Sequence, residues 1–232
     1  MGKAILDPVS HTYKVVGDDR VDPSLELPSV SNIARLATAP FMKGLFIWAI
    51  NAYISSNNIY EFEKLRHDAG VYGSYIHDVL ANTIKGTYEP RPESDETKQL
   101  VRAWGDLMES YGIRFADAEI AVYNPLSLYA GTFDAIGTVG SDFNEETIIF
   151  DWKTKNKKSP PSPNDAVQLA GYALAIEAMD SEPLPMPKPT RGVVVYLYRD
   201  IKTAGWCEVD LEKAKVGFKH CLGLYKAGGY YV

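Results

Sequence analysis

The sequence predicts an α/β (α+β) protein whose mixed β-sheet contains an antiparallel meander and is flanked by helices. Three observations support this prediction. Up to residue 112 the hydrophobic residues recur mainly with helical spacing. From Ile113 onward the period changes to two, which indicates strands. An alanine-rich helical stretch then separates the third of these strands from a fourth, so a right-handed crossover can place the fourth parallel to the third.

The N-terminal part begins with extended pieces. His11 to Val16 alternates weakly, and a second short extended piece follows it. A hydroxyl group of Ser29 or Ser31 can then accept a hydrogen bond from the first turn of a helix. The segment from Phe41 to Ile54 is helical in pattern and largely apolar, which predicts a buried helix.

Two longer helices follow, from Glu61 to Ile84 and from Glu93 to Tyr111. The first contains small residues on neighbouring turns, which allow another element or a substrate to approach closely. The second has acidic residues in its first turn, where they favour the helix dipole. Gly112 suits the position just after the second helix, where the backbone often turns left-handed.

Three strands with tight connections then form the predicted meander: Ile113 to Tyr123, Leu128 to Val139 and Thr147 to Lys153. A basic, proline-rich loop leads to the crossover helix, which Asn164 or Asp165 is expected to cap. The remaining elements are a buried strand at Arg191–Tyr198, a strand at Ala204–Val209 that pairs with it, and a helix capped by Asp210.

Composition and charge limit the function. The chain has 232 residues, 46% hydrophobic and 23% charged, which is typical of a soluble globular protein. Its two cysteines form no CxxC pair and indicate neither a disulfide framework nor a four-thiolate cluster. The start has no signal-peptide pattern, and the longest apolar run, Gly44 to Ile54, is too short to span a bilayer. We therefore expect a soluble, cytoplasmic protein without membrane contact.

The net charge of −6 argues against a passive nucleic-acid coat, which is usually basic. It does not argue against an enzyme that acts on nucleic acid. Carboxylates that hold metal ions count as negative in the formal sum, but bound cations neutralise them.

Three polar side chains are expected to meet on two neighbouring strands. Asp151 and Lys153 are two residues apart on one strand, so they project from the same face. Asp134 lies on the adjacent strand and can reach that face. Carboxylate oxygens are the ligands that hard divalent cations prefer, and a lysine beside them adds a fixed positive charge. The sequence thus favours a site for metal-dependent phosphodiester hydrolysis.

Gln168 and Tyr172 are four residues apart on the crossover helix and share one of its faces, so both can point toward the same site. Each piece has an ordinary structural explanation. An Asp-x-Lys pair is often a solvated surface pair, and Gln and Tyr are common at the edge of a core. The order, spacing and placement of the pieces together favour a functional site.

The motifs resemble those of the PD-(D/E)XK nuclease superfamily in its RecB-like branch. The resemblance is carried by GTFDAIG (131–137), IIFDWKTKN (148–156) and QLAGYALA (168–175). Upstream, GSYIH (73–77) is similar to the Gly-x-x-x-His helix motif of that branch. The N-terminal pieces are similar to the opening of phage-encoded exonucleases. The resemblance covers about His11 to Tyr198 and implies a restriction-endonuclease-like core. No break in composition divides the chain, so we expect one nuclease domain over residues 1–232, with N-terminal hairpin and helices (1–112), catalytic sheet with crossover helix (113–210) and C-terminal helix (211–232).

The resemblance also implies roles for individual residues. Asp134 and Asp151 would bind Mg²⁺ or Mn²⁺, Lys153 would be the catalytic lysine, and His77 and the Trp152 carbonyl would be further ligands. Gln168 and Tyr172 would position the nucleic-acid backbone or the lysine. Independently of the resemblance, Lys155, Lys157 and Lys158 crowd the loop that directly follows the site, which favours phosphate contacts over an ordinary solvated loop. Glu119 would only support Lys153 or the metal. Some relatives carry four cysteines for an iron–sulfur cluster, and with two cysteines we expect none here.

The function expected on these grounds is a metal-dependent DNA exonuclease. It would act on free DNA ends or single strands in replication, recombination or repair, in the host cytoplasm if the chain is phage-encoded. Replication or recombination proteins would be its partners. Two alternatives stay open at this point, a nucleic-acid-binding module without turnover on the same fold and a structure-specific endonuclease.

Overall fold

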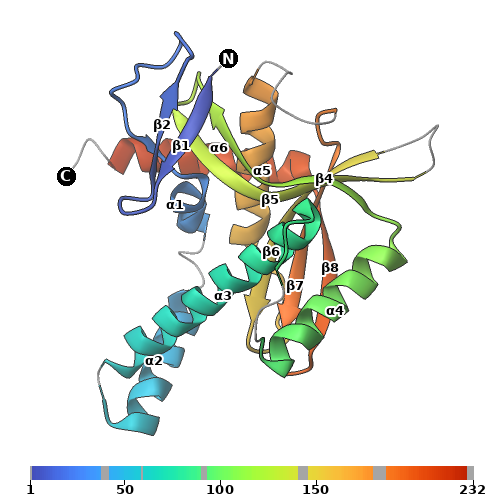
Figure 1. Ribbon diagram of the computed structural model, residues 1–232. Coiled ribbons are helices and arrows are strands. Elements are labelled where there is room, and N and C mark those ends of the chain that lie inside the picture. The colour runs from blue at the N-terminus through green and yellow to red at the C-terminus, as the bar shows by residue number, and fades with distance from the viewer. Residues whose placement is uncertain are drawn as a thin grey trace.

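The computed structural model describes residues 2–37, 42–58, 60–89, 93–140, 146–179 and 187–228. They form a five-stranded mixed sheet and a three-stranded antiparallel sheet, with helices around them (Figure 1). The predicted fold class is confirmed, and this architecture is consistent with a restriction-endonuclease-like core. No helix in these ranges is both long and apolar enough to cross a membrane.

The central sheet has the strand order β4-β5-β6-β7-β8. β4 (Arg114–Asn124), β5 (Tyr129–Val139) and β6 (Glu146–Lys155) form the predicted antiparallel meander. β7 (Arg191–Tyr198) runs parallel to β6, as a crossover connection requires, and β8 (Thr203–Val209) pairs antiparallel with β7 at the edge. The hydrophobic period therefore predicted these five strands to within about two residues.

Helices cover both faces of this sheet (Figure 1). The crossover helix α5 (Pro163–Ala178) and the last helix α6 (Leu211–Gly228) share one hydrophobic core with the sheet. α3 (Glu61–Lys85) and α4 (Asp95–Ser110) close a second core. Continuous apolar strands such as β7 fit this arrangement, since both of their faces are buried.

The predicted caps are partly confirmed. Asp210 accepts a hydrogen bond from the backbone of Lys213 and so caps α6. The cap expected for α5 is wrong, because the N-cap residue is Ser162, with Pro163 at the first position of the helix. Asp165 is buried instead and accepts a hydrogen bond from the Tyr196 hydroxyl. Because its carboxylate bonds to Tyr196, Asp165 does not cap the helix.

The N-terminal strands form the separate small sheet. β2 (Thr12–Val16) matches the predicted extended segment and pairs with β3 (Leu27–Pro28). It also pairs with β1 (Lys3–Asp7), which the sequence pattern did not single out. Ser29 then caps the short helix α1 (Val30–Ala34) by accepting from the Asn32 backbone, as predicted.

The helix expected from the apolar segment is α2 (Met42–Ser56), and over residues 47–56, whose side chains are described, most positions are exposed rather than buried. Ile47 is 50% exposed, Ile50 is 56% exposed and Ile54 is 71% exposed. α2 packs on α3, and α2 with the N-terminal part of α3 projects away from the central sheet (Figure 1). The apolar pattern correctly indicated a helix, but periodicity alone does not decide what covers it.

Candidate metal centre

The candidate site begins where the β5–β6 ladder ends. The last paired residues are Ala135 and Phe150, and beyond them β5 leaves β6. Asp134, the next residue, is buried, and its carboxylate accepts a hydrogen bond from the backbone N–H of Trp152. A carboxylate thus replaces the missing strand partner, which fixes its position relative to β6.

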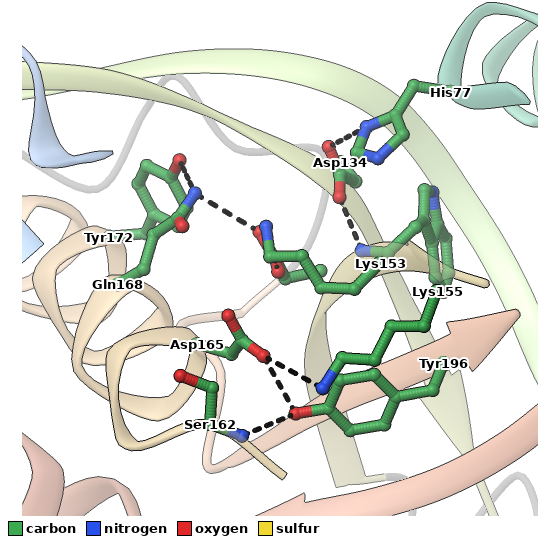
Figure 2. A network of polar contacts seen from close by, with 11 residues as sticks. His77, Asp134, Lys153, Lys155, Ser162, Asp165, Gln168, Tyr172 and Tyr196 are labelled. Atoms are coloured by element: carbon green, nitrogen blue, oxygen red, sulfur yellow. Dashed lines mark hydrogen bonds and ion pairs between the residues drawn. The ribbon is translucent and has the colours of Figure 1, made fainter. Parts of the chain in front are cut away.

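α3 brings a histidine to this carboxylate. At Gly73 a side-chain carbon would lie 3.2 Å from the Thr154 hydroxyl, so this glycine lets α3 approach β6 closely. One turn later, His77 Nδ1 lies 3.0 Å from an oxygen of Asp134 (Figure 2). Burial alone would lower the pKa of His77, but the Asp134 charge outweighs it and raises this pKa to about 9.

Glu119 completes a three-residue donor cluster. One donor atom each from His77, Glu119 and Asp134 lie within 4.8 Å of one another. In the ladder Glu119 falls between the pairs Ala118–Ala135 and Ile120–Phe133, across from Asp134. Its φ of 52° is a left-handed conformation that a non-glycine residue rarely adopts inside a strand, and such strain is typical of functional sites. Desolvation of its carboxyl group, together with the Asp134 charge, raises its pKa to about 7.

Asp151 and Lys153 form an ion pair beside this cluster, with 2.6 Å between Lys153 Nζ and a carboxylate oxygen. Burial raises the pKa of Asp151 to about 7, with the Lys153 charge opposing the rise and Asp134 adding to it. Burial lowers the pKa of Lys153, but the charges of Asp151 and Asp134 outweigh burial, so the pKa rises and the ammonium group stays charged. The predicted meeting of Asp134, Asp151 and Lys153 is therefore present in the fold.

Gln168 and Tyr172 face the same place from α5 (Figure 2). Gln168 Nε2 donates to Asp151 over 3.4 Å and to the Tyr172 hydroxyl over 2.8 Å. The polar face predicted from their spacing thus points at the second carboxylate. Gln168 contacts Asp151 directly, and Tyr172 holds Gln168, so the two side chains together orient this carboxylate.

Of the remaining predicted residues, Trp152 and Lys155 are turned inward, and Lys157 and Lys158 are exposed. Trp152 is fully buried, and its indole packs among aromatic rings on the far side of the sheet from Asp151. Lys155 is turned inward, 4.0 Å from an Asp165 oxygen and 4.1 Å above the Tyr196 ring. Lys157 and Lys158 are exposed on the loop that follows β6. Their roles toward nucleic acid stay predictions.

Sequence reasoning missed one network next to the site. The Tyr196 hydroxyl donates to Asp165 and accepts from the Ser162 backbone, and this joins β7 to the start of α5 (Figure 2). From the sequence, Asp165 is expected to cap the helix, because acidic residues are common in the first turn. Its actual partner, Tyr196, is brought to it by the pairing of β7 with β6. Glu119 was likewise expected only as support, because its strained backbone is invisible in the sequence.

The donor set fits a divalent cation. The cluster offers one imidazole nitrogen and carboxylate oxygens from two residues. Metal ligands bind without their protons, so a cation bound here would displace the protons that the raised pKa values of His77 and Glu119 otherwise retain. His77, Glu119 and Asp134 would hold such an ion. Its identity as Mg²⁺ or Mn²⁺ stays a prediction.

No family model matches the chain, and no curated protein matches it. Among solved structures, the chain is similar to an alkaline exonuclease from Laribacter hongkongensis, with 14% sequence identity and a TM-score of 0.33. The overlap covers 68% of this chain and 86% of that one. A likeness this distant supports no functional conclusion.

Proposed function

We propose that this chain is a metal-dependent nuclease that hydrolyses phosphodiester bonds in DNA. One observation supports the proposal above all others. The His77–Glu119–Asp134 donor cluster and the Asp151–Lys153 ion pair converge where the β5–β6 ladder ends. A cation site next to a charged lysine matches the demands of phosphoryl chemistry, which relies on placement and electrostatics.

The surroundings of Lys153 and Gln168 suggest a separate role for each residue beside the cation site. When bound, a divalent cation would polarise a phosphoryl oxygen and make water a stronger acid. Lys153 holds its positive charge next to the donor cluster, where it can stabilise negative charge that develops on the phosphate. Gln168 fixes the orientation of Asp151, so the carboxylate and the ammonium group keep their relative positions.

The finer proposal is an exonuclease that acts on free ends or single strands and serves replication, recombination or repair. A digestion of end-labelled linear DNA and closed circular DNA with Mn²⁺ tests it. The wild-type protein should shorten linear DNA progressively and leave the circle intact. Lys153→Ala and Asp151→Ala should abolish cleavage while circular dichroism shows an unchanged fold.

The two alternatives give different outcomes in the same gel. Cleavage of the circle would indicate an endonuclease. DNA binding by a protein that cleaves neither substrate in Mn²⁺ would indicate a binding module and contradict the proposal. Cleavage that persists in Lys153→Ala would also contradict it, since a contaminating nuclease does not depend on this residue.

A further inference from the structure

The N-terminal sheet reaches the part of β5 that has separated from β6. Over residues 129–133, β5 pairs with β4, and its first pair with β6 is at Ala135. The small sheet packs against this stretch of β5 (Figure 1). Ser29, which caps α1, forms an isolated parallel bridge with Ala130. The first 30 residues of the chain therefore supply contacts to β5 just before it reaches Asp134.

Tyr13 of β2 makes a specific contact within this stretch. Its hydroxyl and the hydroxyl of Thr132 share a hydrogen bond of 3.0 Å, although 119 positions separate the two residues. Tyr13 is 4% exposed, so water competes little for the bond. Thr132 lies two residues before Asp134, and side chains at this spacing project from the same face of a strand, about 7 Å apart. The bond therefore holds the face of β5 that carries Asp134.

The opposite face of this stretch is covered as well. A side-chain carbon at Gly131 would lie 2.5 Å from the Tyr172 ring and 3.0 Å from a methyl group of Val30. α5 and α1 therefore touch β5 from the side that Thr132 does not face. Because both faces are in contact, the backbone that leads into Asp134 has little room to move. The position of the Asp134 carboxylate, which meets His77, depends on these contacts.

The Tyr13 hydroxyl is also within electrostatic range of the donor cluster. Burial raises the pKa of Tyr13, the hydrogen bond with Thr132 opposes this rise, and the charge of Glu119 adds to it. Glu119 is one of the three donor residues of the cluster. A raised pKa keeps the phenol neutral at pH 7, so Tyr13 adds no charge to the cluster. Its contribution is to the placement of other side chains.

We propose that Tyr13 is a positioning residue of the metal centre, which through Thr132 fixes the place of Asp134. The N-terminal sheet is then part of the functional site, although it lies outside the central sheet. The inference rests on the proposed function, because it concerns the same metal centre. Residues that orient metal ligands contribute about 10- to 100-fold to metal affinity. Tyr13 acts through another residue, so we expect an effect of about tenfold.

Isothermal titration of the full chain with Mn²⁺, without DNA, tests this inference. Tyr13→Phe removes the hydroxyl and should lower Mn²⁺ affinity about tenfold. Tyr123→Phe is the matched control, because Tyr123 is 2% exposed and its hydroxyl also ties the N-terminal part to the central sheet, donating to Asp18 over 2.7 Å. The control should bind Mn²⁺ as the wild-type protein does. Unchanged affinity in Tyr13→Phe, or an equal loss in both variants, would overturn the inference.

Variants of the partner residue decide the question should Tyr13→Phe fail to fold. Thr132→Val nearly keeps the shape of the side chain but removes the hydroxyl, so Mn²⁺ affinity should again fall about tenfold. Thr132→Ser keeps the hydroxyl and should bind Mn²⁺ nearly as tightly as the wild-type protein. Equal affinities in Thr132→Val and Thr132→Ser would overturn the inference, because the hydroxyl would then have no effect on the metal.

The titration separates this inference from the proposed function. A tenfold loss in Tyr13→Phe, in a protein that cuts no DNA, would support the positioning role and contradict the nuclease. A wild-type protein that binds Mn²⁺ and cuts DNA, with no effect of Tyr13→Phe on Mn²⁺ affinity, would overturn the positioning role alone. A wild-type protein that binds no Mn²⁺ would overturn both.

Discussion

The imidazole Nδ1 of His77 lies 3.0 Å from a carboxylate oxygen of Asp134, although 57 positions separate the two residues in the sequence. The contact joins α3 to the point where β5 leaves the sheet. Glu119 approaches the same carboxylate from β4. Three elements thus deliver one donor residue each to one point, which is how a preorganised metal site is built.

The first prediction concerns metal binding. Asp134→Asn keeps the shape of the side chain but removes its charge. We expect Mn²⁺ affinity to fall by more than the roughly 10- to 100-fold that loss of an outer-sphere partner causes, because a ligand itself is lost. Isothermal titration of the protein with Mn²⁺, without DNA, measures this effect.

Asp165→Asn is the matched control, since Asp165 is equally buried but lies outside the donor cluster. It should bind Mn²⁺ as the wild-type protein does. Unchanged Mn²⁺ binding in Asp134→Asn would show that the cluster is not a metal centre.

Parts of this site could be predicted from the sequence because they follow from local periodicity. The alternation that indicates strands also puts Asp151 and Lys153 on one face, and the helical repeat does the same for Gln168 and Tyr172. Both predictions follow from the spacing of two residues within one strand or one helix. The roles of these residues stay predictions until they are tested.

Other parts depend on contacts between distant segments. The left-handed backbone of Glu119 and the pairing of Asp165 with Tyr196 arise from the register of the sheet, which spacing does not reveal. The same limit explains α2. Its apolar residues indicate a helix correctly, but burial depends on which other elements reach it.

The second prediction concerns the buried ion pair. Lys153→Met leaves the Asp151 carboxylate buried without its cation, so the free energy of unfolding should fall by about 3 kcal/mol. Adding Asp151→Asn removes that charge and should recover most of the loss. Urea unfolding of both single variants and the double variant measures the coupling. Purely additive effects would mean that the two side chains do not form a pair in solution.

The third prediction concerns pH and the attachment of the N-terminal sheet. Asp18 accepts hydrogen bonds from Arg20 and, over 2.7 Å, from the Tyr123 hydroxyl of β4. The bonds from Arg20, opposed by partial burial and helped by Tyr123, hold the pKa of Asp18 well below its ordinary value. A lowered pKa in the folded state means that this stabilisation is fully present above about pH 4 and is lost as the pH falls.

Asp18→Asn should therefore lower the free energy of unfolding by about 1 to 2 kcal/mol at pH 7. The difference from the wild-type protein should shrink steadily below pH 4. Unfolding curves at several pH values measure it. A difference that stays constant down to pH 2 would mean that the Asp18 charge does not contribute.

The last prediction concerns the glycine that opens the GTFD segment. A side-chain carbon at Gly131 would lie 2.5 Å from the Tyr172 ring and 3.0 Å from Val30. Gly131→Ala must therefore displace the ring, and with it the hydrogen bonds that run from Tyr172 through Gln168 to Asp151. We expect a loss of about 1 to 3 kcal/mol in stability and a fall in DNA cleavage beyond what that loss explains.

Gly105→Ala on α4, where an added carbon meets nothing within 4 Å, should instead stabilise the protein by about 0.5 to 1 kcal/mol. Should Gly131→Ala lose stability but cleave DNA at the wild-type rate, the orientation of Asp151 by Gln168 and Tyr172 would play no part in the reaction.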